Sequence, residues 1–155
     1  MILSGPEPQK GILKHKLERV YKEKEPITVI LEGRPGDTSE SVRSGNIITY
    51  NHLSSSDMRK MLTGSNKIIA RSGYSTIMDL ISLNCSALLI PTPGQTEQIY
   101  LAERMMAKNW FYCIEQKDLN LVRDVEIVKN YNGVFLPNST EKTVKFIWDK
   151  FIVSN

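Results

Sequence analysis

The sequence predicts an α/β fold, in which helices cover both faces of a six-stranded, mostly parallel β-sheet. Short apolar runs alternate about six times with helix-like segments along the 155 residues, and this alternation is typical of mostly parallel sheets. The run Ile27–Leu31 is apolar apart from Thr28, as expected of a strand that is covered on both faces. We therefore predict a Rossmann-like three-layer sandwich that occupies residues 1–155 as a single domain.

Six apolar or aromatic runs, separated by turn residues, mark the strands. In a Rossmann-like order the first and fourth strands are neighbours at the switch point, where ligands bind. Residues 38–45 are polar and are expected to form a loop. The expected strands are Ile2–Leu3, Ile27–Leu31, Asn46–Asn51, Lys67–Ala70, Ser86–Ile90 and Trp110–Ile114.

Helices are expected between the strands, where apolar residues recur every three or four positions and polar residues precede the helix starts. Pro26 ends the first helix, and Gly64 closes a second one that is capped within Ser54–Asp57. The others are Tyr74–Leu83, Thr96–Lys108, Asp118–Asn130 with a break, and a last helix that Asn138 or Ser139 caps; the first is Gly11–Lys24.

The composition is ordinary for a soluble globular chain, with 41% hydrophobic and 24% charged residues. The net charge of +3 is not concentrated in a basic stripe, which argues against nucleic-acid binding. Cys85 and Cys113 lie in apolar runs and are expected to be buried free thiols, which indicates a reducing, cytoplasmic compartment. No apolar run approaches the roughly 20 residues of a membrane span.

The start of the chain, Met1–Gly5, has neither the basic region nor the long apolar core of a signal peptide. It is typical of a strand end that enters a glycine turn. We expect either one domain of a longer protein or a naturally free domain that pairs with a second chain.

Two polar loops, Arg71–Gly73 and Thr92–Gln95, follow two of the expected strands. Both would project from the carboxyl edge of a parallel sheet, where ligands bind. The first loop opens a helix, whose free N–H groups and dipole favour a phosphate; the alternative is an ordinary cap and turn. Ser4–Gly5 forms a similar small-residue turn after the first strand.

Several polar side chains near these loops are suited to a sugar nucleotide. Asp79 either accepts hydrogen bonds from ribose hydroxyls or is a solvated helix residue. Glu97 and Gln98 either bind sugar hydroxyls or belong to a capping box at the start of their helix. His52 either lines a base pocket or ends the third strand.

Other catalytic signatures are missing from the sequence. It contains no G-x-G-x-x-G, no P-loop and no G-x-S-x-G elbow. The two histidines, His15 and His52, are not paired with cysteines or carboxylates at ligand spacing, so we expect no metal site.

The stretch from Arg71 to Glu103 resembles a known family. It contains Arg71-Ser72-Gly73-x-x-Thr76-x-x-Asp79, then Leu88-Leu89-Ile90-Pro91, then Gln98-x-x-x-Ala102. This series resembles the C-terminal, donor-binding domain of family 28 GT-B glycosyltransferases, in particular the group that forms lipid II with N-acetylglucosamine. The donor-binding subunit of the two-chain eukaryotic dolichol-linked N-acetylglucosamine transferase belongs to the same broad family.

The resemblance implies a UDP-sugar as co-substrate, with no other cofactor, and assigns a set of donor contacts. The sequence departs from the family at Ile99, because the family usually has a second glutamine at this position. The implied contacts are Ser4 and Gly5 near the phosphates; His52 and Leu53 at the uracil edge; Ser72, Gly73 and Tyr74 at the diphosphate, flanked by Arg71 and Ser75; Asp79 at the ribose; and Gln98, with Gln95 and Glu97, at the donor sugar.

In this family the catalytic base and the acceptor site belong to an N-terminal domain that the chain lacks, so the resemblance implies no catalytic residue here. It also implies no essential metal, because helix N-termini and backbone donors stabilise the leaving group. The missing domain or a partner subunit would complete the enzyme and carry peripheral contact with the inner face of the membrane.

Two other functions stay open. One is a non-catalytic subunit or module that binds a sugar nucleotide and needs a partner chain. The other is a UDP-N-acetylglucosamine epimerase, which shares the GT-B architecture but needs additional carboxylates and a histidine in the cleft.

Overall fold

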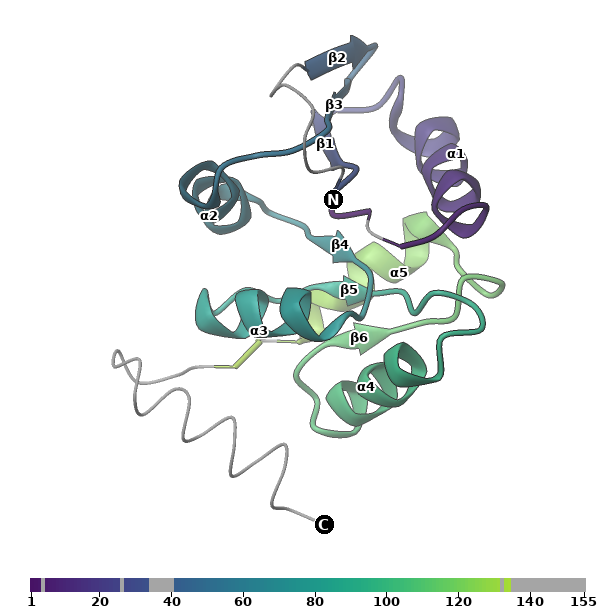
Figure 1. The fold of residues 1–155 in the computed structure, drawn as a ribbon, viewed down its shortest axis with the longest axis vertical. Helices are drawn as coiled ribbons and strands as arrows, with labels where there is room; N and C mark the ends of the chain where they lie inside the picture. The colour runs from purple at the N-terminus through teal and green to yellow at the C-terminus, as the bar shows by residue number, and fades with distance from the viewer. Residues whose placement is uncertain (4, 26, 34–40, 132, 135–155) are drawn as a thin grey trace.

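The computed structural model describes residues 1–3, 5–25, 27–33, 41–131 and 133–134, which form an α/β fold (Figure 1). The last expected helix, which begins at Asn138 or Ser139, lies outside the described residues. In chain order the elements are α1 (Gln9–Tyr21), β1 (Thr28–Leu31), β2 (Ser41–Ser44), β3 (Ile47–Tyr50), α2 (Ser55–Gly64), β4 (Ile69–Ala70), α3 (Tyr74–Ser82), β5 (Leu88–Leu89), α4 (Thr96–Ala107), β6 (Tyr112–Cys113), α5 (Leu121–Ile127) and the 3-10 helix η1 (Val128–Asn130).

The strands form two three-stranded sheets, in the orders β1-β3-β2 and β4-β5-β6, where the sequence predicts one six-stranded sheet. β1 is parallel to β3, and β5 is parallel to both β4 and β6. The prediction of a loop over residues 38–45 is wrong at Ser41–Ser44, because these residues form β2, which pairs antiparallel with β3. All four residues of β2 are exposed, so no apolar pattern marks this strand in the sequence.

The N-terminal residues lie between the two sheets and hydrogen-bond to both (Figure 1). Ile2 forms parallel bridges with Leu31 of β1 and with Ala70 of β4. The Ile2 N–H donates to the Ile69 carbonyl at 2.9 Å, and the Leu3 N–H donates to the Leu31 carbonyl at 2.7 Å. The first expected strand therefore neighbours the fourth, as a Rossmann-like order predicts.

Apolar side chains gather into two clusters, one on each face of the strands. Side chains of α2, α3 and α4 belong to the first cluster, and side chains of α1 and α5 belong to the second. Neighbouring residues of one strand divide between them: Ala70 and Leu89 join the first, and Ile69 and Leu88 join the second. Helices therefore cover both faces, as the sequence predicts.

Two further expectations concern the cysteines and the membrane. Cys85 and Cys113 are buried and free, as predicted. Among the described residues, no helix has the length and apolar character needed to cross a membrane.

Gly45 connects β2 to β3 with a φ of +59°, and a Cβ built there would lie 2.4 Å from the Lys22 carbonyl oxygen. We expect Gly45→Ala to lower the free energy of unfolding by about 2 kcal/mol, because strained backbone and steric overlap add. Gly64→Ala is the control, because a Cβ at this last residue of α2 meets no atom within 4 Å. Urea denaturation compares the two variants, and equal stability would contradict the steric account.

Candidate functional site

Loops that follow Leu3, β4 and β5 meet at the carboxyl edge of the parallel strands. Gly5 has a φ of +113°, and a Cβ built on it would lie 3.2 Å from Thr92 Oγ1. The first loop therefore packs against the loop after β5, and this contact favours glycine at position 5. The Thr92 hydroxyl is buried and has no hydrogen-bond partner among the described residues.

Ser72 ties the start of α3 to the first turn of α4. Its side chain is fully buried, and its Oγ donates to the Gln98 backbone carbonyl at 2.8 Å. The sequence left open an ordinary cap at this position, but Gly73 is the N-cap residue and no side chain caps α3. The hydroxyl of Ser72 therefore holds two helix starts together.

The side-chain amide of Gln98 braces the loop that leads into α4. Its Oε1 accepts from the Thr92 N–H at 2.9 Å, and its Nε2 donates to Gln95 Oε1 at 2.5 Å. Gln95 is the N-cap residue of α4, but its side chain makes no capping hydrogen bond. The capping-box alternative for this loop is therefore wrong. Glu97, in the first turn of α4, is exposed.

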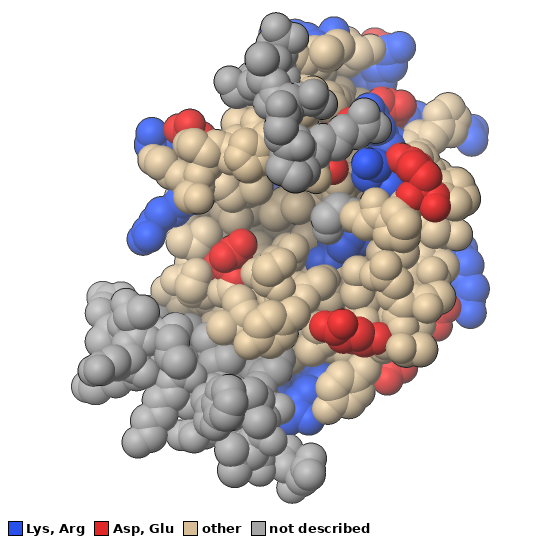
Figure 2. Space-filling model, in the orientation of Figure 1, with Lys and Arg blue, Asp and Glu red and all other residues tan. Residues whose placement is uncertain are grey.

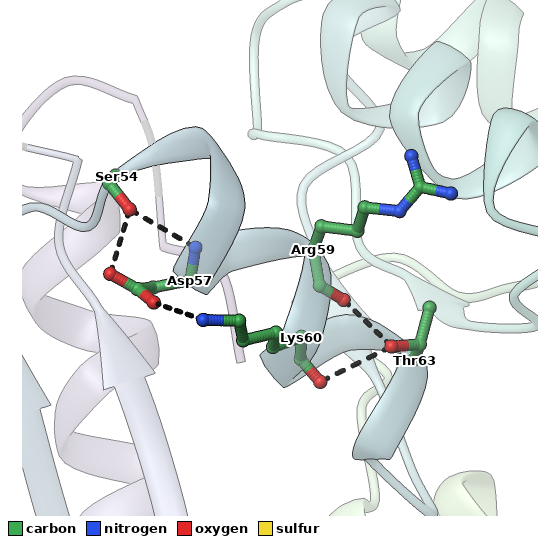
Figure 3. Close-up of polar contacts among 5 residues, drawn as sticks. All are labelled: Ser54, Asp57, Arg59, Lys60 and Thr63. Atoms are coloured by element: carbon green, nitrogen blue, oxygen red, sulfur yellow. Dashed lines mark hydrogen bonds and ion pairs between the residues drawn. The ribbon is translucent and has the colours of Figure 1, made fainter.

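The starts of α3 and α4 differ from those of the other described α-helices. Asn120 caps α5, and Ser54 caps α2 by accepting from the Asp57 N–H at 3.1 Å (Figure 3). At α1 the Glu7 carboxylate accepts from the Gly11 N–H at 3.0 Å. Within the described residues, α3 and α4 are thus the α-helices whose first turns lack a side-chain acceptor and can receive one from a ligand.

The space in front of α3 is open. A Cβ built on Gly73 meets no atom within 4 Å, and its φ of −70° is available to any residue, so glycine here leaves room rather than permitting a turn. Tyr74 and Ser75 are exposed beside it. Asp79 is also exposed, and no described residue bonds to its carboxylate, which is therefore free to accept hydrogen bonds.

Two other predicted contacts lie at the carboxyl end of β3. His52 is exposed and Leu53 is half-buried, and both immediately precede the Ser54 cap of α2. Ser4, predicted to lie near the phosphates, is outside the described residues.

Arg71 points inward, away from solvent. Its fully buried guanidinium donates to the carbonyls of Ile90 and Pro91, both at 3.3 Å, to the Gln9 carbonyl at 2.9 Å and to Gln116 Oε1 at 2.7 Å. Burial lowers the pKa of Arg71 to about 10, so the side chain stays protonated at neutral pH. Arg71 thus connects the start of α1 to the loops that follow β5 and β6.

Two hollows lie away from these loops. One, of roughly 490 Å³, lies between α1 and the β3 side, where Lys14, Arg19 and Thr49 are among its lining residues. The other, of roughly 310 Å³, has Lys67 and Cys85 in its wall. Lys and Arg side chains are scattered over the face seen in Figure 2 and form no single basic stripe there. Within the described residues, no three His, Cys, Asp or Glu side chains group as metal ligands.

A comparison with protein families identifies the chain. The profile of the glycosyltransferase family 28 C-terminal domain matches residues 13–145. The chain belongs to this family. The match includes every candidate contact from His52 onward and begins after Ser4 and Gly5. Comparisons with curated proteins and with solved structures gave no match.

Sequence reasoning missed two residues as parts of this edge. Gln9 and Gln116 accept hydrogen bonds from Arg71, and Gln116 Nε2 also donates to Gln9 Oε1 at 2.9 Å. Gln9 and Gln116 are far apart in the sequence and ordinary in type, so no local pattern marks them.

The bond from Ser72 to Gln98 provides a test of how the two helix starts are held in the family 28 domain. We expect Ser72→Ala to lower the free energy of unfolding by about 1 kcal/mol, because a buried hydrogen bond is lost. Ser75→Ala is the control at an exposed position of the same helix. Urea denaturation measures both, and a stability loss of the same size for Ser75→Ala would contradict the role of Ser72.

Proposed function

We propose that the chain is the donor-binding half of a glycosyltransferase that transfers a hexosyl or N-acetylhexosaminyl group from a UDP-sugar to an acceptor. Membership of family 28 supports a glycosyltransferase domain. The observation that carries the donor role is the pair of uncapped helix starts, α3 and α4, which Ser72 holds together at the carboxyl edge. Such helix starts favour phosphate.

The diphosphate would bind at these two helix starts. Backbone N–H groups of Gly73, Tyr74 and Ser75 would donate to its oxygens, with Ser4 and Gly5 on the opposite side. The open space in front of Gly73 supports this arrangement. In transfer, the same donors would stabilise the charge that develops on the leaving UDP, so that no metal ion is required.

The nucleoside and the sugar would extend in opposite directions from the diphosphate. Asp79 would accept hydrogen bonds from the ribose hydroxyls, and His52 and Leu53 would contact the uracil edge. Gln98 and Glu97 would bind hydroxyls of the donor sugar, with Gln95, whose amide already meets Gln98. The carboxylate of Asp79 is exposed and bonds to none of the described residues, which supports its role.

The remaining parts of the enzyme would come from outside the chain. An N-terminal domain or a partner subunit would supply the catalytic base and the acceptor site, and would bring the complex to the cytoplasmic face of the membrane. The acceptor would then be lipid-linked, as in the lipid II-forming group. In this proposal residues 1–155 belong to a single donor-binding domain, and the two sheets act as one layer through Ile2.

Calorimetric titration with UDP and with pyrophosphate tests the proposal. We expect the protein to bind UDP weakly and Asp79→Ala to weaken UDP binding about tenfold, because hydrogen bonds to a charged group are lost, while pyrophosphate binding changes less than about twofold. Glu103→Ala, at an exposed position of α4, is the control and should leave both affinities unchanged.

Absence of UDP binding by the wild-type protein would overturn the donor role. Equal losses of UDP and pyrophosphate binding in Asp79→Ala would overturn the ribose contact alone. UDP-sugar binding without transfer, once the partner domain or chain is supplied, would favour the non-catalytic module.

A further inference from the structure

Arg71 carries a buried positive charge for which the described residues provide no anion. Its four acceptors are three backbone carbonyls and one neutral side-chain amide, and no described carboxylate forms an ion pair with it. Its Nε has no hydrogen-bond partner among the described residues. A buried charge is costly unless it is paired, so its retention without a carboxylate requires an explanation.

The position of Arg71 in the fold explains why its buried charge is retained. Arg71 directly precedes Ser72 and Gly73 at the start of α3. Its contacts at Ile90 and Pro91 lie at the base of the loop that leads to α4. Arg71 therefore lies in the segment that opens α3 and contacts the loop that leads to α4, so the field of its guanidinium adds to the positive ends of both helix dipoles.

We propose that Arg71 is a positioning and selectivity residue, whose buried charge makes the carboxyl edge prefer a diphosphate over the uncharged nucleoside. This inference rests on the proposed donor role. The guanidinium does not touch the ligand in this proposal: it acts through space, in a low-dielectric interior where screening by water is weak. It also fixes the loops that present the backbone donors.

Gln116 offers a way to cancel the charge without removing Arg71. Its Oε1 lies 2.7 Å from the Arg71 guanidinium, so Gln116→Glu would put a carboxylate of nearly the same shape directly against the cation. Gln9, which accepts from Gln116 through its Oε1, would meet the new carboxylate with its Nε2 after an amide flip. The hydrogen bond between Arg71 and residue 116 is kept, and only the charge of residue 116 changes.

The experiment measures UDP and uridine affinities of the full chain by NMR titration. We expect Gln116→Glu to weaken UDP binding about fivefold or more, because a unit charge is cancelled near the phosphates, and to change uridine binding by less than about twofold. Asn130→Asp carries the same charge change at an exposed position of η1 and should leave both affinities unchanged.

Two further variants separate charge from architecture. Gln116→Met removes the acceptor without adding charge, so it should weaken both ligands by the same factor. Arg71→Lys keeps the charge, so it should keep the wild-type ratio of UDP to uridine affinity even where stability falls. This variant also provides the test if Gln116→Glu does not fold.

The outcomes are distinguishable. A UDP-to-uridine ratio that is unchanged in Gln116→Glu, or that falls in Arg71→Lys as far as in Gln116→Glu, would overturn the role of the charge and leave a purely structural tether. A wild-type protein that binds neither UDP nor uridine would instead overturn the proposed donor function.

Discussion

The backbone pairing of Ile2 is the constraint on which the rest of the structure depends. Without its bridges to Leu31 and Ala70, β1-β3-β2 and β4-β5-β6 would be separate sheets, and the loops that follow them would share no edge. With these bridges, Gly5 comes against Thr92, and Gln98 links Thr92 to Ser72 in the loop after β4. A ligand site assembled from several loops becomes possible because one bridging residue joins two sheets.

The side chains at this edge are mostly committed to one another. Ser72 bonds to the Gln98 carbonyl, the Gln98 amide braces residues 92–95, and Arg71 reaches three segments from within. None of these side chains caps α3 or α4, so the backbone N–H groups at both helix starts remain available as donors. Donors fixed in this way need little reorganisation when charge develops on a leaving group, which suits a transferase that relies on electrostatic stabilisation.

Much of the fold could be predicted from the sequence, because continuous apolar runs and helical periodicity report burial directly. β2 could not, because Ser41–Ser44 is exposed and pairs only through its backbone. The sequence predicts a break within the helix Asp118–Asn130, and the structure has α5 followed by η1 there; the predicted burial of both cysteines is confirmed. The sequence predicts one six-stranded sheet, but the structure has two three-stranded sheets, because Ile2 joins them by isolated bridges rather than as a strand.

The sequence could predict that the candidate site lies at the carboxyl edge of the sheet, but it could not predict which contacts the side chains there make. Arginine is rarely fully buried, so the inward direction of Arg71 runs against the usual preference of its residue type. Ser72 occupies a position where a cap is expected, and only the tertiary contact with α4 shows its role. Gln116 joins the edge from a loop whose proximity depends on the sheet order.

The central claim is that a sugar nucleotide binds across the starts of α3 and α4. An amide chemical-shift map recorded during a UDP titration tests it most directly. The account predicts that the largest shifts occur at Gly73, Asp79 and Gln98. Shifts confined to the hollow between α1 and β3, around Lys14 and Thr49, would contradict it.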